Sequence, residues 1–355
     1  MVKLDVVHQF NTNLANSQPL VAVLAGATAG IGEATVRSLA EAHGTHGKGL
    51  RVYFVGRNSK AAQQIIADCK GICPNGEFIF VRASDLALLK EVDRVCEGIL
   101  KAEQTVANDG KAKIDLLVLS QGMLSFDPRK DTPEGLDEIM SLSYYSRMRF
   151  IIQLLPLLLE STIGHVVSVF NPKLEGKVIL DDLSLREPKN FAFKIGASHL
   201  VHLHTFFFEN LAQRHARKLS LIHLFPGLVL TNAAYNGNLP TWMKMLWRYV
   251  VAPLSGWRAV PKAECGARIL FLTSPKYPAR SMNAGGDAHT VDDLEVATSS
   301  DGIVGGGAYR IDLDGETIAT GEAYETAKAA GMYDLVYEHT MKAFKEIEAG
   351  RAFKD

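Results

Sequence analysis

The chain has 355 residues, of which 47% are hydrophobic and 22% are charged, so it carries enough apolar material for a substantial core. Its formal net charge of -1 argues against a nucleic-acid-binding protein, because phosphate recognition normally needs a basic excess. The N-terminal residues have no long apolar core, and no stretch approaches the roughly 20 apolar residues of a membrane span. We therefore expect a protein of the reducing cytoplasm without stable membrane insertion.

Short β-like runs alternate with helical ones from about residue 20 onward. Several of the β-like runs are uniformly apolar, as expected where helices cover both faces of a parallel sheet. Strands are predicted at residues 20–24, 51–55, 77–82, 114–119, 164–169, 219–224 and 307–313, and helices at 33–42, 134–159 and 193–216. The pattern predicts one α/β domain over residues 20–355, after an N-terminal extension of residues 1–19. The domain is expected to be a doubly wound parallel sheet between two layers of helices, a three-layer αβα arrangement.

The strongest motif comes directly after the first predicted strand and opens a helix. It is a glycine-rich turn with the spacing GxxxGxG. Glycine allows a tight turn and lets the backbone approach a diphosphate closely, and the free N–H groups at a helix start attract its negative charge. The residues that we expect to bind the diphosphate of a dinucleotide are Gly26, Thr28, Ala29, Gly30, Ile31 and Gly32.

With its strand before and its helix after, this turn resembles the signature of the short-chain dehydrogenase/reductase family, and the likeness covers about residues 20–315. The resemblance implies a Rossmann fold and a nicotinamide dinucleotide cofactor. The second strand ends at Arg57 and Asn58, where sites that prefer NAD have an acidic side chain for the ribose 2′-hydroxyl. Because no acid is present and an arginine pairs well with a phosphate, NADP(H) is favoured over NAD(H). The alternative is that Arg57 is a solvated loop cation.

Three further segments, after the third, fourth and sixth strands, resemble the family's cofactor pocket. In the family, an aspartate after the third strand meets the adenine, and Asn-Ala-Gly usually follows the fourth. A PGxVxT segment after the sixth strand holds the nicotinamide carboxamide. The corresponding residues here are Asp85 and Leu86, then Ser120, Gln121 and Gly122, and finally Pro226, Gly227, Val229 and Thr231.

The catalytic residues that the family uses are only partly present. In the family, a serine after the fifth strand bonds the substrate oxygen, while a Tyr-x-x-x-Lys on the next helix supplies a proton and binds the ribose. An asparagine on the preceding helix orients the lysine through water. Aligned on this chain, the serine position is Asn171, the tyrosine position Asn190, the lysine Lys194 and the helper asparagine Ser143. No change of register restores the tyrosine, because the chain has none between Tyr145 and Tyr235.

The missing tyrosine leaves three interpretations open. An asparagine amide polarises a carbonyl but has no proton to give near neutral pH. Hydride transfer to an iminium or a conjugated acceptor would need little enzymic acid, and Lys194 or Tyr144 could supply a proton if geometry allowed. The second interpretation is a redox-neutral cyclisation, isomerisation or dehydration beside a structural dinucleotide. The third is a nucleotide-binding pseudoenzyme without turnover.

The divergent catalytic residues, together with segments 144–147 and 225–231, are similar to a branch of the family common in filamentous fungi. Members of that branch accompany secondary metabolism. The likeness implies a small, mostly apolar polyketide, terpenoid or alkaloid as substrate.

Two segments after the sixth strand stand apart from the β/α alternation. Residues 232–257 are rich in large apolar side chains, and we expect them to form a C-terminal lid over an apolar ligand. A core or dimer-contact helix is nearly as well supported, and shallow membrane contact is a weaker alternative. Residues 280–306 are predicted to be a polar, glycine-rich insertion. The apolar residues of the lid are Tyr235, Trp242, Met243, Met245, Trp247 and Tyr249.

The histidines and cysteines do not form a metal set. No carboxylate or cysteine completes the series His199, His202 and His204, so we interpret these residues as helix-packing or interface residues. Cys69 and Cys73 have no companion pair and are expected to be reduced thiols on or near a helix. Many relatives dimerise or tetramerise through the helix of the histidine series, so a homodimer or tetramer is a further expectation.

Overall fold

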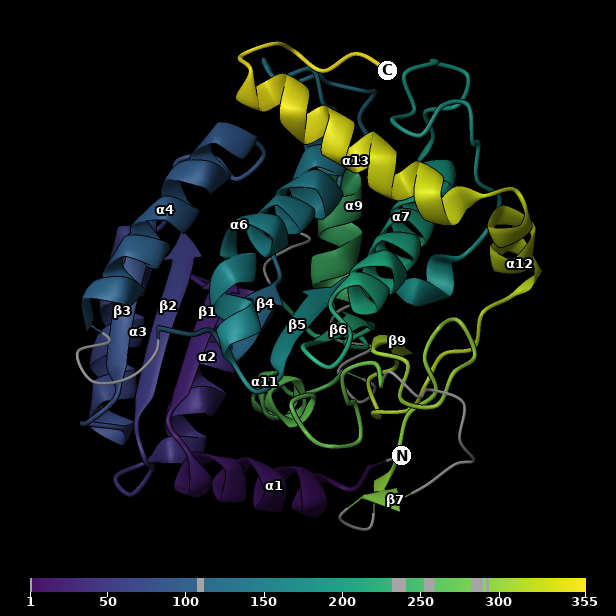
Figure 1. Ribbon diagram of the computed structural model, residues 1–355. Helices are drawn as coiled ribbons and strands as arrows, with labels where there is room; N and C mark the ends of the chain where they lie inside the picture. Colours follow the sequence, from purple (N-terminus) through teal and green to yellow (C-terminus); the bar gives the residue numbers. More distant parts are fainter. Residues whose placement is uncertain (1, 107–111, 232–240, 252–258, 282–289, 292–293) are drawn as a thin grey trace.

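The computed structural model describes residues 2–106, 112–231, 241–251, 259–281, 290–291 and 294–355 (Figure 1). Its centre is a 7-stranded parallel sheet with the strand order β3-β2-β1-β4-β5-β6-β9. The strands are β1 Leu20–Ala25, β2 Leu50–Gly56, β3 Glu77–Arg82, β4 Leu116–Leu119, β5 Gly164–Val169, β6 Leu219–Leu224 and β9 Ala308–Ile311. The order reverses between β1 and β4, which confirms the doubly wound fold, and in such folds ligands bind at the carboxyl ends of the strands where the order reverses.

Helices cover both faces of the sheet, as the uniformly apolar strands predicted (Figure 1). Val21, Val23 and Ala25 of β1 belong to one hydrophobic cluster, while the intervening Ala22 and Leu24 belong to the other. The first cluster lies under α4 Leu89–Val106, α6 Ser146–Glu160, α7 Phe193–Arg214, α12 Glu322–Ala329 and α13 Met332–Glu348. The second lies under α1 Leu4–Ser17, α2 Gly30–His43, α3 Ser59–Ile72 and α11 Lys262–Phe271.

The predicted N-terminal extension is a helix docked on the domain. Asn11 of α1 is buried, and its amide Nδ2 donates a 2.8 Å hydrogen bond to the carbonyl of Ala267 in α11. The Phe10 ring packs edge-on against Phe271, with centroids 5.5 Å apart. These contacts make residues 4–17 part of the layer that covers one face of the sheet.

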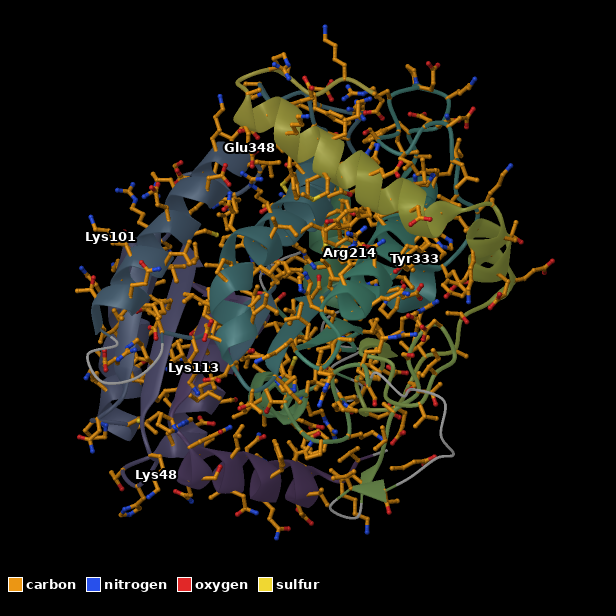
Figure 2. The ribbon with its side chains drawn as sticks, in the orientation of Figure 1. Lys48, Lys101, Lys113, Arg214, Tyr333 and Glu348 are labelled. Carbon is orange, nitrogen blue, oxygen red and sulfur yellow. The ribbon has the colours of Figure 1, made fainter. Side chains whose placement is uncertain are left out.

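The C-terminal helix α13 lies across α6 and α7, in yellow in Figure 1. Its two ends are tied to the helices beneath, near the labelled Arg214, Tyr333 and Glu348 of Figure 2. Arg149 of α6 pairs with Glu348 at 2.7 Å, and the guanidinium of Arg214 lies 4.0 Å from the ring centroid of Tyr337. This cover over α6 and α7 was not predicted from the sequence.

The predicted helix 134–159 is shorter and is broken into three pieces. Gly135 has a φ of +80°, which a helix does not accept, and Asp137 caps the start of α5 Glu138–Met140 by accepting bonds from Ile139 and Met140 N–H groups. A π-helical turn, η1 Ser141–Tyr145, joins α5 to α6. The predicted insertion 280–306 includes two short antiparallel strands, β7 Thr290–Val291 and β8 Leu294–Glu295.

Candidate active site

The turn between β1 and α2 has the conformation that its glycines predicted. Gly26 and Gly30 have φ angles of +78° and +65°, which other residues rarely adopt. A Cβ on Gly32 would lie 2.7 Å from both the Gly26 carbonyl oxygen and Ser120 Oγ, so this position has room for glycine only. Ala29, the residue before α2, provides no side-chain cap, so the first N–H groups of the helix are free for a ligand. The turn therefore fits the diphosphate of a dinucleotide.

Two distant segments that the resemblance assigned to the cofactor pocket lie against this turn. A Cβ on Gly26 would lie 2.6 Å from the Gln121 backbone nitrogen, and Ser120 Oγ donates a 2.9 Å hydrogen bond to the Ala25 carbonyl. The Thr231 methyl group would lie 3.4 Å from a Cβ on Gly30. The segment of Pro226 and Val229 that leads to Thr231 bends at Gly227, whose φ is +74°. Segments 120–122 and 226–231 thus border the phosphate turn.

The end of β2 meets the same turn. A Cβ on Gly56 would come within 2.6 Å of Thr28 Oγ1, so the two backbones approach closely. Arg57, the next residue, is exposed, and in the described part of the chain it makes no ion pair. The Asn58 side chain instead caps α3 by accepting a 3.1 Å hydrogen bond from the Ala61 N–H. Arg57 is therefore the residue at this corner that is free to meet a phosphate.

The predicted adenine-binding residues follow β3 in a short turn. Asp85 Oδ1 accepts a 2.9 Å hydrogen bond from the Ala87 N–H, and Leu86 is buried. Both stand at the carboxyl edge of the sheet, one strand beyond Arg57.

The three residues aligned with the family's catalytic groups are not hydrogen-bonded to one another in the described part of the chain. Lys194 lies in the first turn of α7 and is exposed. Asn190 precedes the helix, and its Nδ2 donates a 2.7 Å hydrogen bond to Asp182. Asn171 accepts a 3.0 Å hydrogen bond from the Lys173 N–H and so caps the short helix η2 Pro172–Leu174. Across the described ranges, no hydrogen bond joins any two of Asn171, Asn190 and Lys194.

A cavity of about 410 Å³ lies beside the carboxyl ends of β4 and β5. Its α7 side is formed by Phe193, Gly196, Ala197 and Leu200, which share one helix face, whereas Asn190 and Lys194 do not line it. The expected roles, Lys194 as anchor of the ribose and Asn190 as a group that polarises the substrate, therefore stay predictions, and neither residue belongs to the lining of this cavity. The other lining residues are Met123, Leu124, Ser125, Phe126, Asp127, Pro128, Asp137, Ile139, Met140, Ser143, Phe170, Leu174, Phe191 and Ala192.

In the π-helical turn, the side chains of Ser143 and Tyr144 point in different directions. Ser143 lines the cavity, but the Tyr144 hydroxyl meets Thr340 Oγ1 of α13 at 2.7 Å. Complete burial raises the pKa of Tyr144 well above its usual value. The prediction that Tyr144 supplies a proton is therefore corrected: its hydroxyl is used to join η1 to the C-terminal helix. Tyr145 does the same, with its hydroxyl 2.7 Å from His339 Nε2.

Arg147 is a residue of the site that the sequence analysis missed. Its guanidinium is buried, and it donates to Ser168 Oγ and the Val169 carbonyl, each at 2.8 Å, and to the Gln121 carbonyl at 3.1 Å. Burial lowers its pKa to about 9, and no carboxylate pairs with it among the described residues. Arg147 thus joins the segment that follows β4 to the end of β5. A cation inside an otherwise apolar helix face was the signal that could have revealed it.

The histidine series of α7 packs against the loop after β5. His199 Nε2 accepts a 2.9 Å hydrogen bond from the Ile179 N–H, and His202 Nε2 donates to the Gly176 carbonyl at 2.8 Å. His204 Nδ1 donates to the Leu200 carbonyl within the helix, and its ring is buried. All three are therefore packing residues of α7, as the sequence analysis interpreted them. Within the ranges that the structure covers, no three metal-ligating side chains gather at one point.

The predicted lid is described only in part. Residues 232–240 and 252–258, with Tyr235, lie outside the described residues. Between them, α9 Thr241–Leu246 and the π-helical turn η3 Trp247–Val251 leave Trp242 and Tyr249 mostly exposed. Over the described residues, we find no helix with the length and apolar character to cross a membrane.

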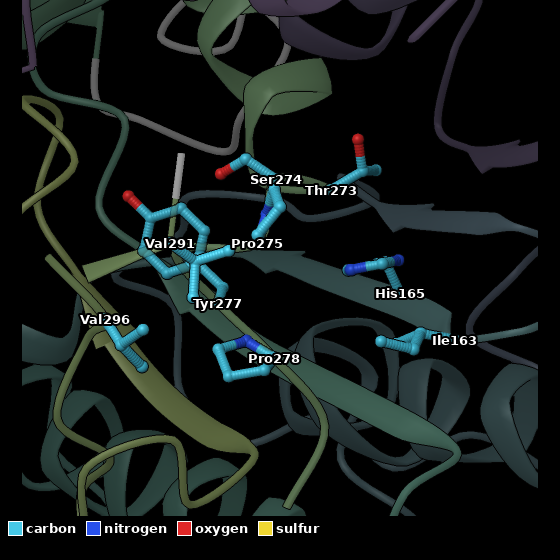
Figure 3. A pocket seen from close by; sticks show the side chains of 9 residues that line it. All are labelled: Ile163, His165, Thr273, Ser274, Pro275, Tyr277, Pro278, Val291 and Val296. Atoms are coloured by element: carbon cyan, nitrogen blue, oxygen red, sulfur yellow. The ribbon is translucent and has the colours of Figure 1, made fainter. Parts of the chain in front are cut away.

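A second cavity, of about 300 Å³, lies at the opposite edge of the sheet (Figure 3). It is lined by Ile163 and His165 near the start of β5 and by residues after α11 such as Ser274 and Tyr277 (Figure 3). Burial lowers the pKa of His165 to about 4, so its imidazole is neutral. Because the phosphate turn is at the carboxyl edge, this cavity is not part of the candidate active site.

Known proteins resemble the chain along nearly its whole length. A family model described as short chain dehydrogenase matches residues 20–172. The chain is 34% identical to "Short-chain dehydrogenase/reductase SAT2" of Stachybotrys chartarum over 98% of each chain. It is 32% identical to "Oxidoreductase AN1596" of Emericella nidulans, over 96% of this chain and 97% of that one.

The solved structures show the same fold. The "RhlG/NADP active-site complex" of Pseudomonas aeruginosa superimposes with a TM-score of 0.52 at 17% identity, over 73% of this chain and 91% of that chain. The fold, the phosphate turn and the sequence relatives all indicate the same family. The chain therefore belongs to the short-chain dehydrogenase/reductase family of oxidoreductases.

Proposed function

We propose that the chain is an NADP(H)-dependent oxidoreductase that acts on a small, largely apolar metabolite without a tyrosine as proton donor. The observation that carries the proposal is the cavity beside β4 and β5, whose α7 side is formed by Phe193, Gly196, Ala197 and Leu200. This side suits an apolar ligand, and it has no group that donates a proton. Ser143 is buried at the same cavity and provides a hydroxyl for one hydrogen bond to the ligand.

The residues around the phosphate turn fit a bound NADP(H). The amides of the first turn of α2 would hold the diphosphate, and Arg57 would pair with the 2′-phosphate. When bound, the nicotinamide supplies or accepts a hydride. Ser120 and Thr231 lie against the turn and would border the cofactor there.

The size and lining of the cavity support a small organic substrate. Its volume of about 410 Å³ lies within the range of known small-molecule sites, and most of its lining is aliphatic or aromatic. The two relatives described above are oxidoreductases of fungi. Together with the resemblance to the fungal branch, this supports a secondary metabolite as substrate.

Cofactor preference is tested by titrating NADPH and NADH into the native protein and into Arg57→Gln. A lost charge-assisted hydrogen bond costs about 1.5–3 kcal/mol, so we expect NADPH affinity to fall about 10- to 100-fold and NADH affinity to stay within about twofold. Lys101→Gln, on α4, removes the same charge elsewhere and should change neither affinity. Equal losses for both cofactors in Arg57→Gln would contradict the NADP(H) assignment.

Hydride transfer is tested with NADPH that carries deuterium at the transferred position. Deuterium in the product, at the carbon that is reduced, supports the oxidoreductase. The apolar α7 side of the cavity also suits a redox-neutral cyclase or isomerase, which needs no hydride. If the substrate is transformed at the same rate with oxidised, reduced or no cofactor, that second function replaces the first.

A further inference from the structure

The mouth of the cavity combines exposed aromatic rings with a carboxylate. The rings of Phe126 and Phe193 lie with centroids 4.6 Å apart, yet the two residues remain 46% and 48% exposed. Asp127, next to Phe126, also lines the cavity and is exposed. The face of an aromatic ring carries negative potential, so both kinds of group at this mouth attract positive charge.

The rest of the cavity lining has no positive side chain to oppose them. Its charged residues are Asp127 and Asp137, and no lysine, arginine or histidine lines the cavity in the described part of the chain. Asp137 already accepts hydrogen bonds from three backbone N–H groups, of residues 130, 139 and 140. For the Asp127 carboxylate, the described residues provide no hydrogen bond or ion pair.

The cations nearest in sequence are engaged elsewhere or lie outside the lining. Lys130 pairs with Glu138 at 2.9 Å, and the charge of Asp127 contributes only a smaller part of the rise in the pKa of Lys130; Arg129 pairs with Asp131 at 2.8 Å. Lys194, in the first turn of α7, is exposed to solvent and does not line the cavity. Asp127 is therefore the charged group at this mouth that can pair with a positively charged ligand.

We propose that the substrate of this site is an apolar organic cation, an iminium ion, held by the Asp127 carboxylate and the rings of Phe126 and Phe193. The inference rests on the proposed function and specifies its substrate class. In the step, the iminium carbon accepts a hydride from the reduced nicotinamide and a C–H bond forms. The π electrons of the C=N bond become the nitrogen lone pair, and the nicotinamide becomes oxidised. No proton is consumed, so the site needs no tyrosine.

The test compares two probes of similar size, of which one is positively charged and the other is neutral. N-methyl dihydroisoquinolinium is a bicyclic iminium cation, and tetralone is a neutral bicyclic ketone. Calorimetric titration of the full chain, with and without NADP⁺, measures the affinity for each probe. We expect the cation to bind about tenfold more tightly than the ketone at low salt, and this ratio to shrink as salt screens the exposed carboxylate. Equal affinities, or a ratio that salt does not change, would overturn the proposal.

Three variants assign the effect to the mouth. Asp127→Asn should lower the affinity for the cation about fivefold and leave that for tetralone within about twofold. Asp181→Asn removes an exposed carboxylate that does not line the cavity, and it should change neither affinity. Phe126→Leu keeps the charge of the site but removes one ring, so it should lower the affinity for the cation more than the affinity for the ketone. Equal effects on both probes in Asp127→Asn and Phe126→Leu would contradict the assignment.

The failure of this proposal is distinguishable from the failure of the proposed function. Deuteride transfer from labelled NADPH to a neutral conjugated ketone, with none to the iminium probe, would overturn the cation proposal and leave the oxidoreductase standing. Selective binding of the cation without transfer to any acceptor would support the binding site and overturn the oxidoreductase.

Discussion

Glu209 is a buried carboxyl of α7 whose two hydrogen-bond partners are both neutral. The residue is 4% exposed, and its Oε1 accepts bonds from Ser300 Oγ at 2.6 Å and from the Tyr324 hydroxyl at 2.9 Å. These partners belong to the segment before β9 and to α12, so the carboxyl joins α7 to the C-terminal part of the chain. Burial without a paired cation raises the pKa of Glu209 from 4.5 to about 7.

The raised pKa makes stability depend on pH with a definite sign. Because the folded pKa of Glu209 lies above the unfolded value of 4.5, the folded state binds this proton more tightly. The resulting stabilisation is complete below about pH 4.5 and is lost as the pH rises through about 7. At about 1.4 kcal/mol for each unit of pKa, the whole effect is about 3 kcal/mol.

The variant Glu209→Gln keeps the shape of the protonated carboxyl and cannot ionise. Urea unfolding at pH 5 and pH 8 measures the free energy of unfolding of the native chain and the variant. We expect the variant to gain about 2–3 kcal/mol relative to the native chain between these two pH values. Glu325→Gln, on the exposed side of α12, should follow the native pH dependence. If the free energy of unfolding of Glu209→Gln has the same pH dependence as that of the native chain, then Glu209 is ionised throughout and the reasoning from burial is wrong.

Further predictions concern the phosphate turn and the link to the C-terminal helix. Gly32→Ala would place a methyl group 2.7 Å from Ser120 Oγ and should lower NADPH affinity by more than about tenfold in a calorimetric titration, since the turn must shift. Its control is Gly98→Ala on α4, where a Cβ meets nothing within 4 Å; this change should raise the melting temperature by about 1 °C and leave NADPH affinity unchanged. Tyr144→Phe removes the bond to Thr340 and should cost about 1 kcal/mol in urea unfolding without abolishing turnover. Loss of turnover at native stability would instead make Tyr144 the proton donor.

The strands and the phosphate turn could be predicted because local sequence determines them. Each strand is a short apolar run, and the alternation with helices indicates a parallel sheet buried on both faces. The turn depends on φ angles that Gly26 and Gly30 adopt without strain, so its conformation is visible in the residue types alone. Helix α13 could not be placed in the same way. Its apolar residues, such as Val336 and Phe344, indicate a helix, but the face that covers α6 and α7 depends on tertiary packing.

The placement of the catalytic positions depends on where a helix begins, which the sequence marks less clearly. A Tyr-x-x-x-Lys pair works only when both residues lie on one helix face. Asn190 and Lys194 have this spacing, but the chain turns at Asn190, whose side chain bonds Asp182, and α7 starts three residues later, at Phe193. The face that lines the cavity consequently belongs to Gly196 and Leu200. Few features of the sequence mark that boundary, since the helix has no side-chain cap.

The π-helical turn η1 connects the cavity to the C-terminal helix, and this connection gives α13 a part in the site. A π turn holds more residues than an α turn, so the side chains that follow it point in directions that helical periodicity does not predict. Here it sends Ser143 to the cavity and the hydroxyls of Tyr144 and Tyr145 to Thr340 and His339 of α13. Two hydrogen bonds therefore fix the orientation of the turn that carries Ser143 and its buried hydroxyl. We therefore expect Thr340→Val to weaken substrate binding through the position of Ser143, as measured by calorimetric titration, although α13 does not line the cavity.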